Sequence, residues 1–339
     1  MRTFALRAAR ALSAAVPFDG VCLLTIDPGT GVTTGEVVEN GLPPAATRRL
    51  AEIESRAGDV NRFADLAASG RIAAGLSAAT EGHLDRSLRH RELRGPAGLG
   101  DELRATLGDD GRPWGALTLL RRRGDPDFGP REERLVATLA GALTEGLRSA
   151  VLREADPAGA PPWTGVVLLD GDGAVTEADA DGTAWLAELR TPGLPGDAAP
   201  AAVVSVAAAA RAGAPAPARI RTPAGHWLSA RAGALGHGPG ARVAVVLQPA
   251  RAEDLAPLAA DAHGLTPAER RVAELVAEGL PTDAIAESLH LSPWTVQDHL
   301  RSASAKTGVT SRGALVARLF MAAGPARLTD PPVSSRGCA

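Results

Sequence analysis

The chain has 339 residues and a formal net charge of −3 at pH 7, and it is long enough for two or three domains. This slightly acidic balance excludes a protein that coats nucleic acid over its whole surface. Lys306 is the only lysine among 36 basic residues, so the other 35 are arginine, a bias typical of GC-rich genomes. Arginine frequency is therefore a weak sign of a binding patch, and Arg121–Arg123 is predicted to be a solvated strand end.

The sequence predicts a soluble, cytoplasmic protein. Its two cysteines, Cys22 and Cys338, are too few for a disulfide framework and fit a reducing compartment. Arg7 and Arg10 interrupt the apolar residues near the N-terminus, which argues against a signal peptide. No apolar run reaches the length needed to span a bilayer, so no membrane association is expected.

The first part of the chain alternates predicted helices and strands. In chain order these are a helix with Phe4 and Leu12 on one face, strands at 21–26 and 32–38, a polar helical part, strands at 101–107 and 114–120, and a helix after Phe128. This order resembles a GAF domain, whose final strand, phenylalanine and helix are similar to residues 114–147. The resemblance implies an α+β GAF-like sensory or dimerisation domain at 1–152.

A stretch with linker composition, at 156–162, precedes a second segment. Its predicted elements are a strand at 165–170, a hairpin turn at 171–173, a strand at 174–178, helices around Trp185 and at 203–211, and strands at 218–222, 226–232 and 242–247. This order is similar to a compact PAS domain. The resemblance implies an α+β PAS-like domain at 160–250.

The last part of the chain has strong helix start signals after linker-like residues at 249–254. Thr266 is a preferred N-cap residue, Pro267 follows at the first helical position, and Glu269 stands three residues after the cap. Apolar residues at helical spacing continue towards Gly279, where the helix is expected to end.

Three more helices are predicted beyond it. One runs from about Thr282 to Leu289, the next is capped by Ser292, and the last passes through 315–319. Only residues 290–292 connect the second helix to the third, and both carry apolar residues that can form a shared core. Two helices joined in this way form a helix-turn-helix.

These landmarks, from Leu265 through Thr266 and Ser292 to Arg312, resemble the LuxR-type helix-turn-helix domain of bacterial transcription regulators, matched from about Leu265 to Phe320. The resemblance implies a multidomain chain that ends in an all-α four-helix DNA-binding domain at 260–325 and a disordered tail at 326–339. It also implies a homodimer, paired through the fourth helix at 314–320.

The third helix is expected to turn Val296 and Leu300 inward and to present its other face to the DNA major groove. The residues expected to contact DNA are Thr282, Ser292, Trp294, Thr295, Gln297, Asp298, His299, Arg301, Ser302, Lys306 and Arg312. Residues 292–320 hold four basic side chains against one acid. Gln297 departs from the family pattern, in which lysine is common, and His299 either touches phosphate or packs inside the domain.

These features predict a one-component transcription regulator whose sensory modules modulate operator binding. Double-stranded DNA is the expected partner, together with an unidentified small-molecule effector, and RNA polymerase is a candidate protein partner. An enzyme, a cofactor and a metal site are not predicted, because the histidines lack metal-ligand spacing and no phosphate-binding loop or nucleophile elbow occurs. The alternative is a protein-interaction scaffold, which would show no salt-dependent, sequence-selective DNA binding.

Overall fold

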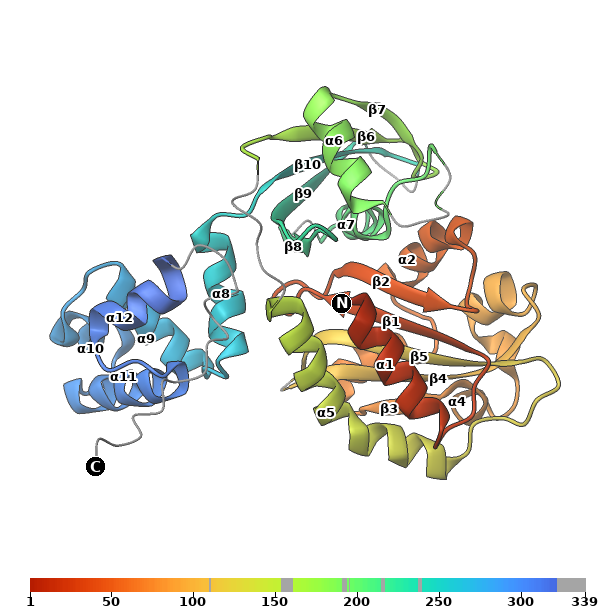
Figure 1. Cartoon of the computed structure of the whole chain (residues 1–339), viewed down its shortest axis with the longest axis horizontal. Helices are drawn as coiled ribbons and strands as arrows, with labels where there is room; N and C mark the ends of the chain where they lie inside the picture. Colours follow the sequence, from red (N-terminus) through yellow and green to blue (C-terminus); the bar gives the residue numbers. More distant parts are fainter. Residues whose placement is uncertain are drawn as a thin grey trace. The chain divides into compact units, whose positions relative to one another are not determined.

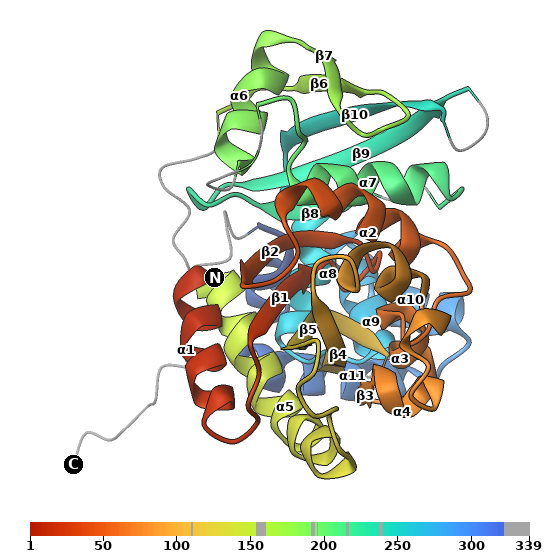
Figure 2. The same cartoon turned by 90° about the vertical axis from the view of Figure 1, so that its right-hand side faces the viewer.

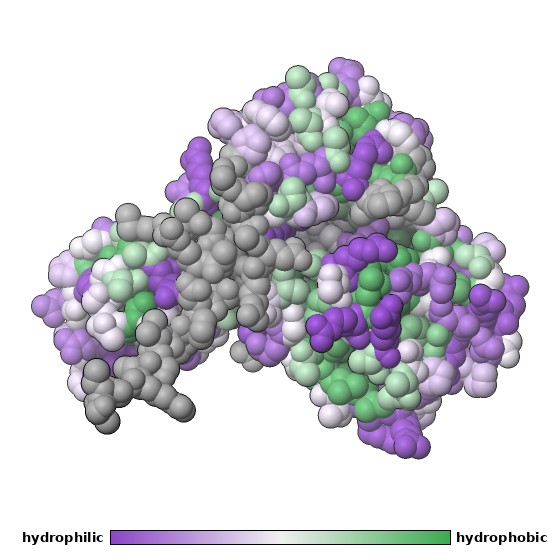
Figure 3. Space-filling view, viewed as in Figure 1, coloured by the Kyte–Doolittle hydropathy of each residue, from purple (hydrophilic) through white to green (hydrophobic). Residues whose placement is uncertain are grey.

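The computed structural model describes residues 1–109, 111–153, 161–190, 194, 196–214, 217–236 and 240–321. The chain divides into two compact units, of which the first comprises Met1–Val151 with Ala160–Pro249 and the second contains Ala250–Ala339. Most of the predicted linker at 156–162 and the whole predicted tail at 326–339 lie outside the described residues. Among the described helices, none is long and apolar enough to cross a membrane. Hydrophilic and hydrophobic residues are interspersed on the face shown in Figure 3.

The first unit contains two antiparallel sheets of five strands each (Figure 1). In the first sheet the strands lie in the order β2-β1-β5-β4-β3. Their bounds are Gly20–Ile26 for β1, Thr33–Glu39 for β2, Ala73–Gly75 for β3, Leu99–Asp109 for β4 and Arg112–Arg122 for β5. The predicted strands of this segment are confirmed as β1, β2, β4 and β5. The short strand β3 carries no alternating pattern and was not expected from the sequence.

Helices cover both faces of this sheet. The helices of this segment are α1 Arg2–Ser13, α2 Thr47–Ser55, α3 Phe63–Ser69, α4 Leu76–Thr80 and α5 Pro130–Arg153, with 3₁₀ turns at Pro44–Ala46 and Leu84–Arg86 and a π turn at His90–Arg94. In both views α1 and α5 lie side by side (Figures 1 and 2). A Cβ on Gly115 of β5 would lie 2.4 Å from the backbone oxygen of Leu24 on β1 and 2.2 Å from Leu147 Cδ2 of α5, so this close packing requires glycine. On the opposite face, Phe63 and Leu66 of α3 pack with Ala116.

The second sheet has the order β7-β6-β10-β9-β8, which repeats the order of the first sheet when its strands are numbered along the chain. The strands are β6 Gly165–Leu169, β7 Val175–Ala178, β8 Ala218–Arg221, β9 Trp227–Leu235 and β10 Arg242–Pro249, and the helices are α6 Ala180–Leu189 and α7 Ala201–Arg211. Trp185 of α6 and Val203 of α7 are fully buried against the sheet, in a core with Val167 and Val243. The elements predicted for this segment are confirmed.

The two sheets are joined by a buried ion pair within the first unit. Asp27, just after β1, accepts hydrogen bonds from the backbone N–H and the Nε of Arg219 on β8, both at 2.7 Å, and from its Nη2. The Asp27 side chain is fully buried. Val32 belongs to the apolar core of the second sheet, and α2 packs against α7. The partners in this ion pair are 192 positions apart, so no local pattern in the sequence indicates it.

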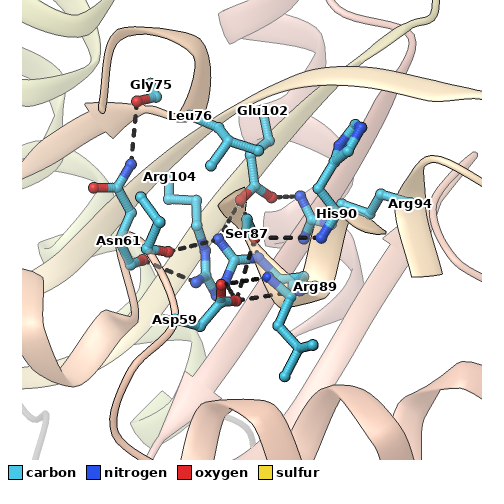
Figure 4. Close-up of polar contacts among 12 residues, drawn as sticks. Asp59, Asn61, Gly75, Leu76, Ser87, Arg89, His90, Arg94, Glu102 and Arg104 are labelled. Atoms are coloured by element: carbon cyan, nitrogen blue, oxygen red, sulfur yellow. Dashed lines mark hydrogen bonds and ion pairs between the residues drawn. The ribbon is translucent and has the colours of Figure 1, made fainter. Parts of the chain in front are cut away.

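A network of buried charges lies on the α3 side of the first sheet (Figure 4). Arg89 is fully buried and donates from Nε to Glu102 Oε1 at 3.0 Å, from Nη1 to Asp59, and from Nη2 to the carbonyl of Val60 at 2.9 Å. Arg94 pairs with the second carboxylate oxygen of Glu102. Each of these charges has a partner, which is what burial of an ion requires.

Arg104 of β4 completes this network. Its Nη2 lies 2.8 Å from Glu54 Oε1, its Nη1 donates to the carbonyl of Asn61 at 2.9 Å, and its guanidinium lies over the Phe63 ring at 3.6 Å. Burial lowers the pKa of Arg104 to about 10, and Arg89 contributes to this decrease by repulsion. The network is therefore part of the core of the first unit.

Arg121 corrects the expectation that Arg121–Arg123 is a solvated strand end. Its side chain is buried, and Nη2 donates to Glu132 Oε1 at 2.6 Å and to the carbonyl of Pro17 at 3.0 Å. The guanidinium also lies 4.1 Å from the centroid of the Phe128 ring. Arg121 is buried because it joins β5 to the start of α5 and to the loop before β1.

The second unit is helical. Its helices are α8 Ala252–Ala262, α9 Pro267–Ala277, α10 Thr282–Leu289, α11 Pro293–Thr307 and α12 Arg312–Val316, and α12 continues as a π turn at Ala317–Met321. The four predicted helices are confirmed as α9 to α12. The linker expected at 249–254 is wrong from Ala252 onward, where α8 begins. Ala259 and Ala260 of α8 are buried in a core with Ala303 and Leu315.

Candidate nucleic-acid interface

Short-range hydrogen bonds fix where α9 begins. The Thr266 hydroxyl accepts from the backbone N–H of Glu269 at 3.3 Å, and Glu269 Oε2 accepts from the backbone N–H of Thr266 at 2.7 Å. This reciprocal pair is the capping box that the sequence predicts. It places Glu269 at the N-terminal end of the domain core.

The turn between α10 and α11 is set by three residues. His290 has a left-handed backbone (φ 54°) that ends α10, and the N–H of Leu291 then donates to the carbonyl of Ala286 at 2.9 Å. Ser292 caps α11 by accepting from the N–H of Thr295 at 3.1 Å. The axis of α11 is thereby fixed relative to α10.

An apolar core holds α9, α10 and α11 together. Val272, Ile285 and Val296 are fully buried, one from each helix. The inward orientation expected for Val296 is confirmed, and Leu300 is partly buried against the same core. The remaining side of α11 is thus free to face solvent or a ligand.

That side carries Trp294, Gln297, Asp298 and Arg301, all exposed. They stand at positions i, i+3, i+4 and i+7, which share one face of a helix. Trp294 is 70% exposed. Arg301 Nη1 lies 3.1 Å from Asp298 Oδ1, with both side chains more than half exposed. These four residues, called the α11 face below, offer one aromatic ring, one amide, one carboxylate and one guanidinium.

The other predicted contact residues are arranged around the α11 face. Ser292, Lys306 and Arg312 are exposed, whereas four residues are half-buried: Thr282, Thr295, His299 and Ser302. Thr282 is the first residue of α10, so it stands at a helix N-terminus. The Arg312 guanidinium donates from Nη2 to the backbone carbonyl of Leu280, which ties α12 to the loop before α10.

Glu269 forms a connection that the sequence did not indicate. Besides capping α9, it accepts from Lys306 Nζ at 2.7 and 3.0 Å and from Ser302 Oγ at 2.6 Å. Burial acts to raise the pKa of Glu269, but the hydrogen bonds from Lys306, Ser302 and Thr266 outweigh it and lower the pKa to about 2. The capping role was visible in the local spacing. The contacts to α11 were not, because they bridge 33 and 37 positions.

Comparison with known proteins assigns this unit to a family. Residues 263–319 match the family described as bacterial regulatory proteins of the luxR family. A stretch of 52 residues is 54% identical to HTH-type transcriptional regulators of Mycobacterium bovis and of Mycobacterium tuberculosis, covering 15% of this chain. The chain spans about 6% of the length of these curated relatives. The matches are thus with regulatory proteins, and the family match lies within the helical unit.

Solved structures give only remote similarity over longer stretches. The Escherichia coli DhaR(N)-DhaL complex aligns over 73% of this chain and 86% of its own, with 15% identity and a TM-score of 0.26. A Vibrio cholerae VqmA dimer aligns over 49% and 87%, with 17% identity and a TM-score of 0.22. Scores this low establish no shared fold for the first unit. The family match and the four helices α9 to α12 together make the C-terminal unit a LuxR-family helix-turn-helix domain.

Proposed function

We propose that this protein is a DNA-binding transcription regulator that recognises operator sequences with the α11 face. The observation that carries the proposal is the match of residues 263–319 to luxR-family regulators, combined with the exposure of Trp294, Gln297, Asp298 and Arg301 on one side of α11. A helix of 15 residues that is capped and supported by two others is a suitable element for a major groove.

The chemistry of the α11 face supports base recognition. Arginine pairs with guanine, glutamine with adenine and aspartate with the cytosine amino group, all in the major groove. Lys306, which the sequence analysis assigned to DNA, already pairs with Glu269, and its proposed role is to hold α11 in place beside any phosphate contact. The proposed contact set is otherwise unchanged, with Thr282, Ser292, Thr295, His299, Ser302 and Arg312 flanking the α11 face.

The first unit is proposed to supply regulation in the cytoplasm. Its two halves, 1–152 and 160–250, are proposed as GAF-like and PAS-like modules that sense a small-molecule effector or form the contacts of a homodimer. The repeated strand order of the two sheets supports treating them as two related modules. A dimer would place two α11 helices on the two halves of a repeated site, which multiplies the weak contacts of one short helix.

The direct test is a binding selection with the full chain on random duplex DNA, followed by affinity measurements from 50 to 200 mM salt. A regulator of this kind selects one sequence, prefers it by about 10³-fold or more over random DNA, and binds less tightly as salt rises. A full-length, folded protein that selects no sequence at low salt contradicts the proposal and favours a scaffold that binds another protein.

A further inference from the structure

Trp294 has an unusual environment for a tryptophan. At 70% exposure it exceeds Leu235, at 48%, and every other exposed large hydrophobic side chain in the described part of the protein. It follows Pro293 as the second residue of α11, where the helix is already capped by Ser292. The ring is therefore not needed to start the helix, and most of its surface contributes nothing to the core. Large exposed apolar side chains of this kind mark contact surfaces.

Its neighbours on the α11 face indicate what the ring contacts. Gln297, Asp298 and Arg301 lie one and two turns further along the same face, and all three present groups that hydrogen-bond to base edges. The N-terminal end of a recognition helix is the part that approaches the bases. Trp294, the second residue of α11, lies at this end of the helix.

The chemistry of the indole ring indicates which group of the DNA it contacts. Indole has a single N–H donor and the rest of its surface is apolar, so most of the exposed ring area can gain only from an apolar contact. The one apolar group that base pairs present in the major groove is the C5 methyl of thymine. We propose that Trp294 is a specificity-determining residue that packs against a thymine methyl in each operator half-site. This inference rests on the proposed function and names the base that the α11 face selects.

The test removes the methyl without changing any hydrogen bond. After a binding selection with the full chain, each thymine of the selected site is replaced in turn by deoxyuridine, and the dissociation constant is measured for the wild type and for Trp294→Ala. In the wild type, replacing thymine by deoxyuridine at one position of each half-site is expected to weaken binding about fourfold, which is the effect of losing one buried methyl group. Trp294→Ala binds the thymine and deoxyuridine sites equally at that position.

Two controls separate recognition from folding. Trp163 is a partly exposed tryptophan of the first unit (39%), and Trp163→Ala should keep the full response to deoxyuridine. The midpoint of thermal unfolding of Trp294→Ala should equal that of the wild type, because the ring is exposed.

The remaining outcomes distinguish failure of the proposed function from failure of the Trp294 assignment alone. A wild-type protein that selects no sequence overturns the proposed function and this inference with it. A selected site without thymine, or a response to deoxyuridine that is equal in the wild type and Trp294→Ala, overturns only the assignment of Trp294. A loss of affinity in Trp294→Ala that is uniform over all sequences would place the ring on the DNA backbone or on a protein partner, and it too overturns the assignment.

Discussion

Arginine has opposite surroundings in the two units. Arg89 in the first unit is fully buried and bonded to two carboxylates and a carbonyl, whereas Arg301 on α11 is 66% exposed and has one carboxylate neighbour. The chain has slightly more than one arginine for every ten residues, so the number of arginines cannot locate a binding surface. Burial separates two kinds of arginine: a guanidinium whose partners are internal is a structural group, whereas one that faces solvent is available for recognition.

The largest effect is expected from a charge placed in the core beneath the α11 face. Val296→Asp puts a carboxylate at a fully buried position with no partner, which costs roughly 4 kcal/mol or more and should unfold the second unit. Gln297→Asp is the matched control, since it adds the same charge one residue further on at an exposed position. Helix content and thermal unfolding, followed by circular dichroism, should separate the two variants. Equal stability would show that the inner and outer faces of α11 are misassigned.

The next largest effect is expected from replacing a buried arginine. Arg89→Ala removes the arginine partner of Asp59 and one of the two arginine partners of Glu102, and it is expected to lower the free energy of unfolding of the first unit by about 3–5 kcal/mol. Arg122→Ala is the control, because Arg122 is 73% exposed at the end of β5 and its loss should change stability by less than about 0.5 kcal/mol. Urea denaturation of both variants measures the difference. Equal losses of stability in both variants would show that buried and exposed arginines do not differ in structural role.

Replacing the exposed Arg301 should change DNA binding and leave folding unchanged. Arg301→Ala is expected to weaken operator binding by about 1–3 kcal/mol, the size of one base-directed contact, while leaving thermal unfolding unchanged. Arg271 is a close match: it is exposed on α9 and lies 3.1 Å from Glu274, as Arg301 does from Asp298. Arg271→Ala removes the same charge and should leave the affinity nearly unchanged. Equal losses in both variants would mean that only net charge matters.

The smallest effect concerns pH. The low pKa of Glu269 means that its ionised form stabilises the folded second unit fully above its ordinary value of 4.5, and that this stabilisation is lost as pH falls towards about 2. Between pH 5 and 3 the wild type should therefore lose on the order of 1 kcal/mol more than Glu269→Gln, which cannot ionise. Urea denaturation at each pH gives both curves. Parallel curves would show that the Lys306 and Ser302 bonds do not hold this charge.

How much the sequence could predict differs between elements for physical reasons. The boundaries of α9 and α11 were predictable because capping acts over three residues, as at Thr266 with Glu269 and at Ser292 with Thr295. Helix α8 was not, since Pro257 lies inside it and opposes helix formation, while the favourable packing of Ala259 on α9, α11 and α12 comes from distant parts of the chain.

The candidate site shows the same division between local and long-range features. The inward and outward faces of α11 follow from helical spacing, so Val296 and Arg301 could be placed from the sequence alone. The partners of charged side chains could not, because ion pairs form between segments that only the fold brings together. Arg121 and Lys306 both looked available in the sequence, and both are engaged by glutamates in the structure.

The ion pair between Lys306 and Glu269 depends on the one side-chain amine of the chain. Lys306 carries the only side-chain amine of the chain, so any reagent or enzyme that acylates lysine has one side chain to modify. Acylation replaces the ammonium with a neutral amide, which cannot form the ion pair that joins the C-terminal half of α11 to the start of α9. One covalent event would then loosen the helix that carries the α11 face, without touching any residue on that face.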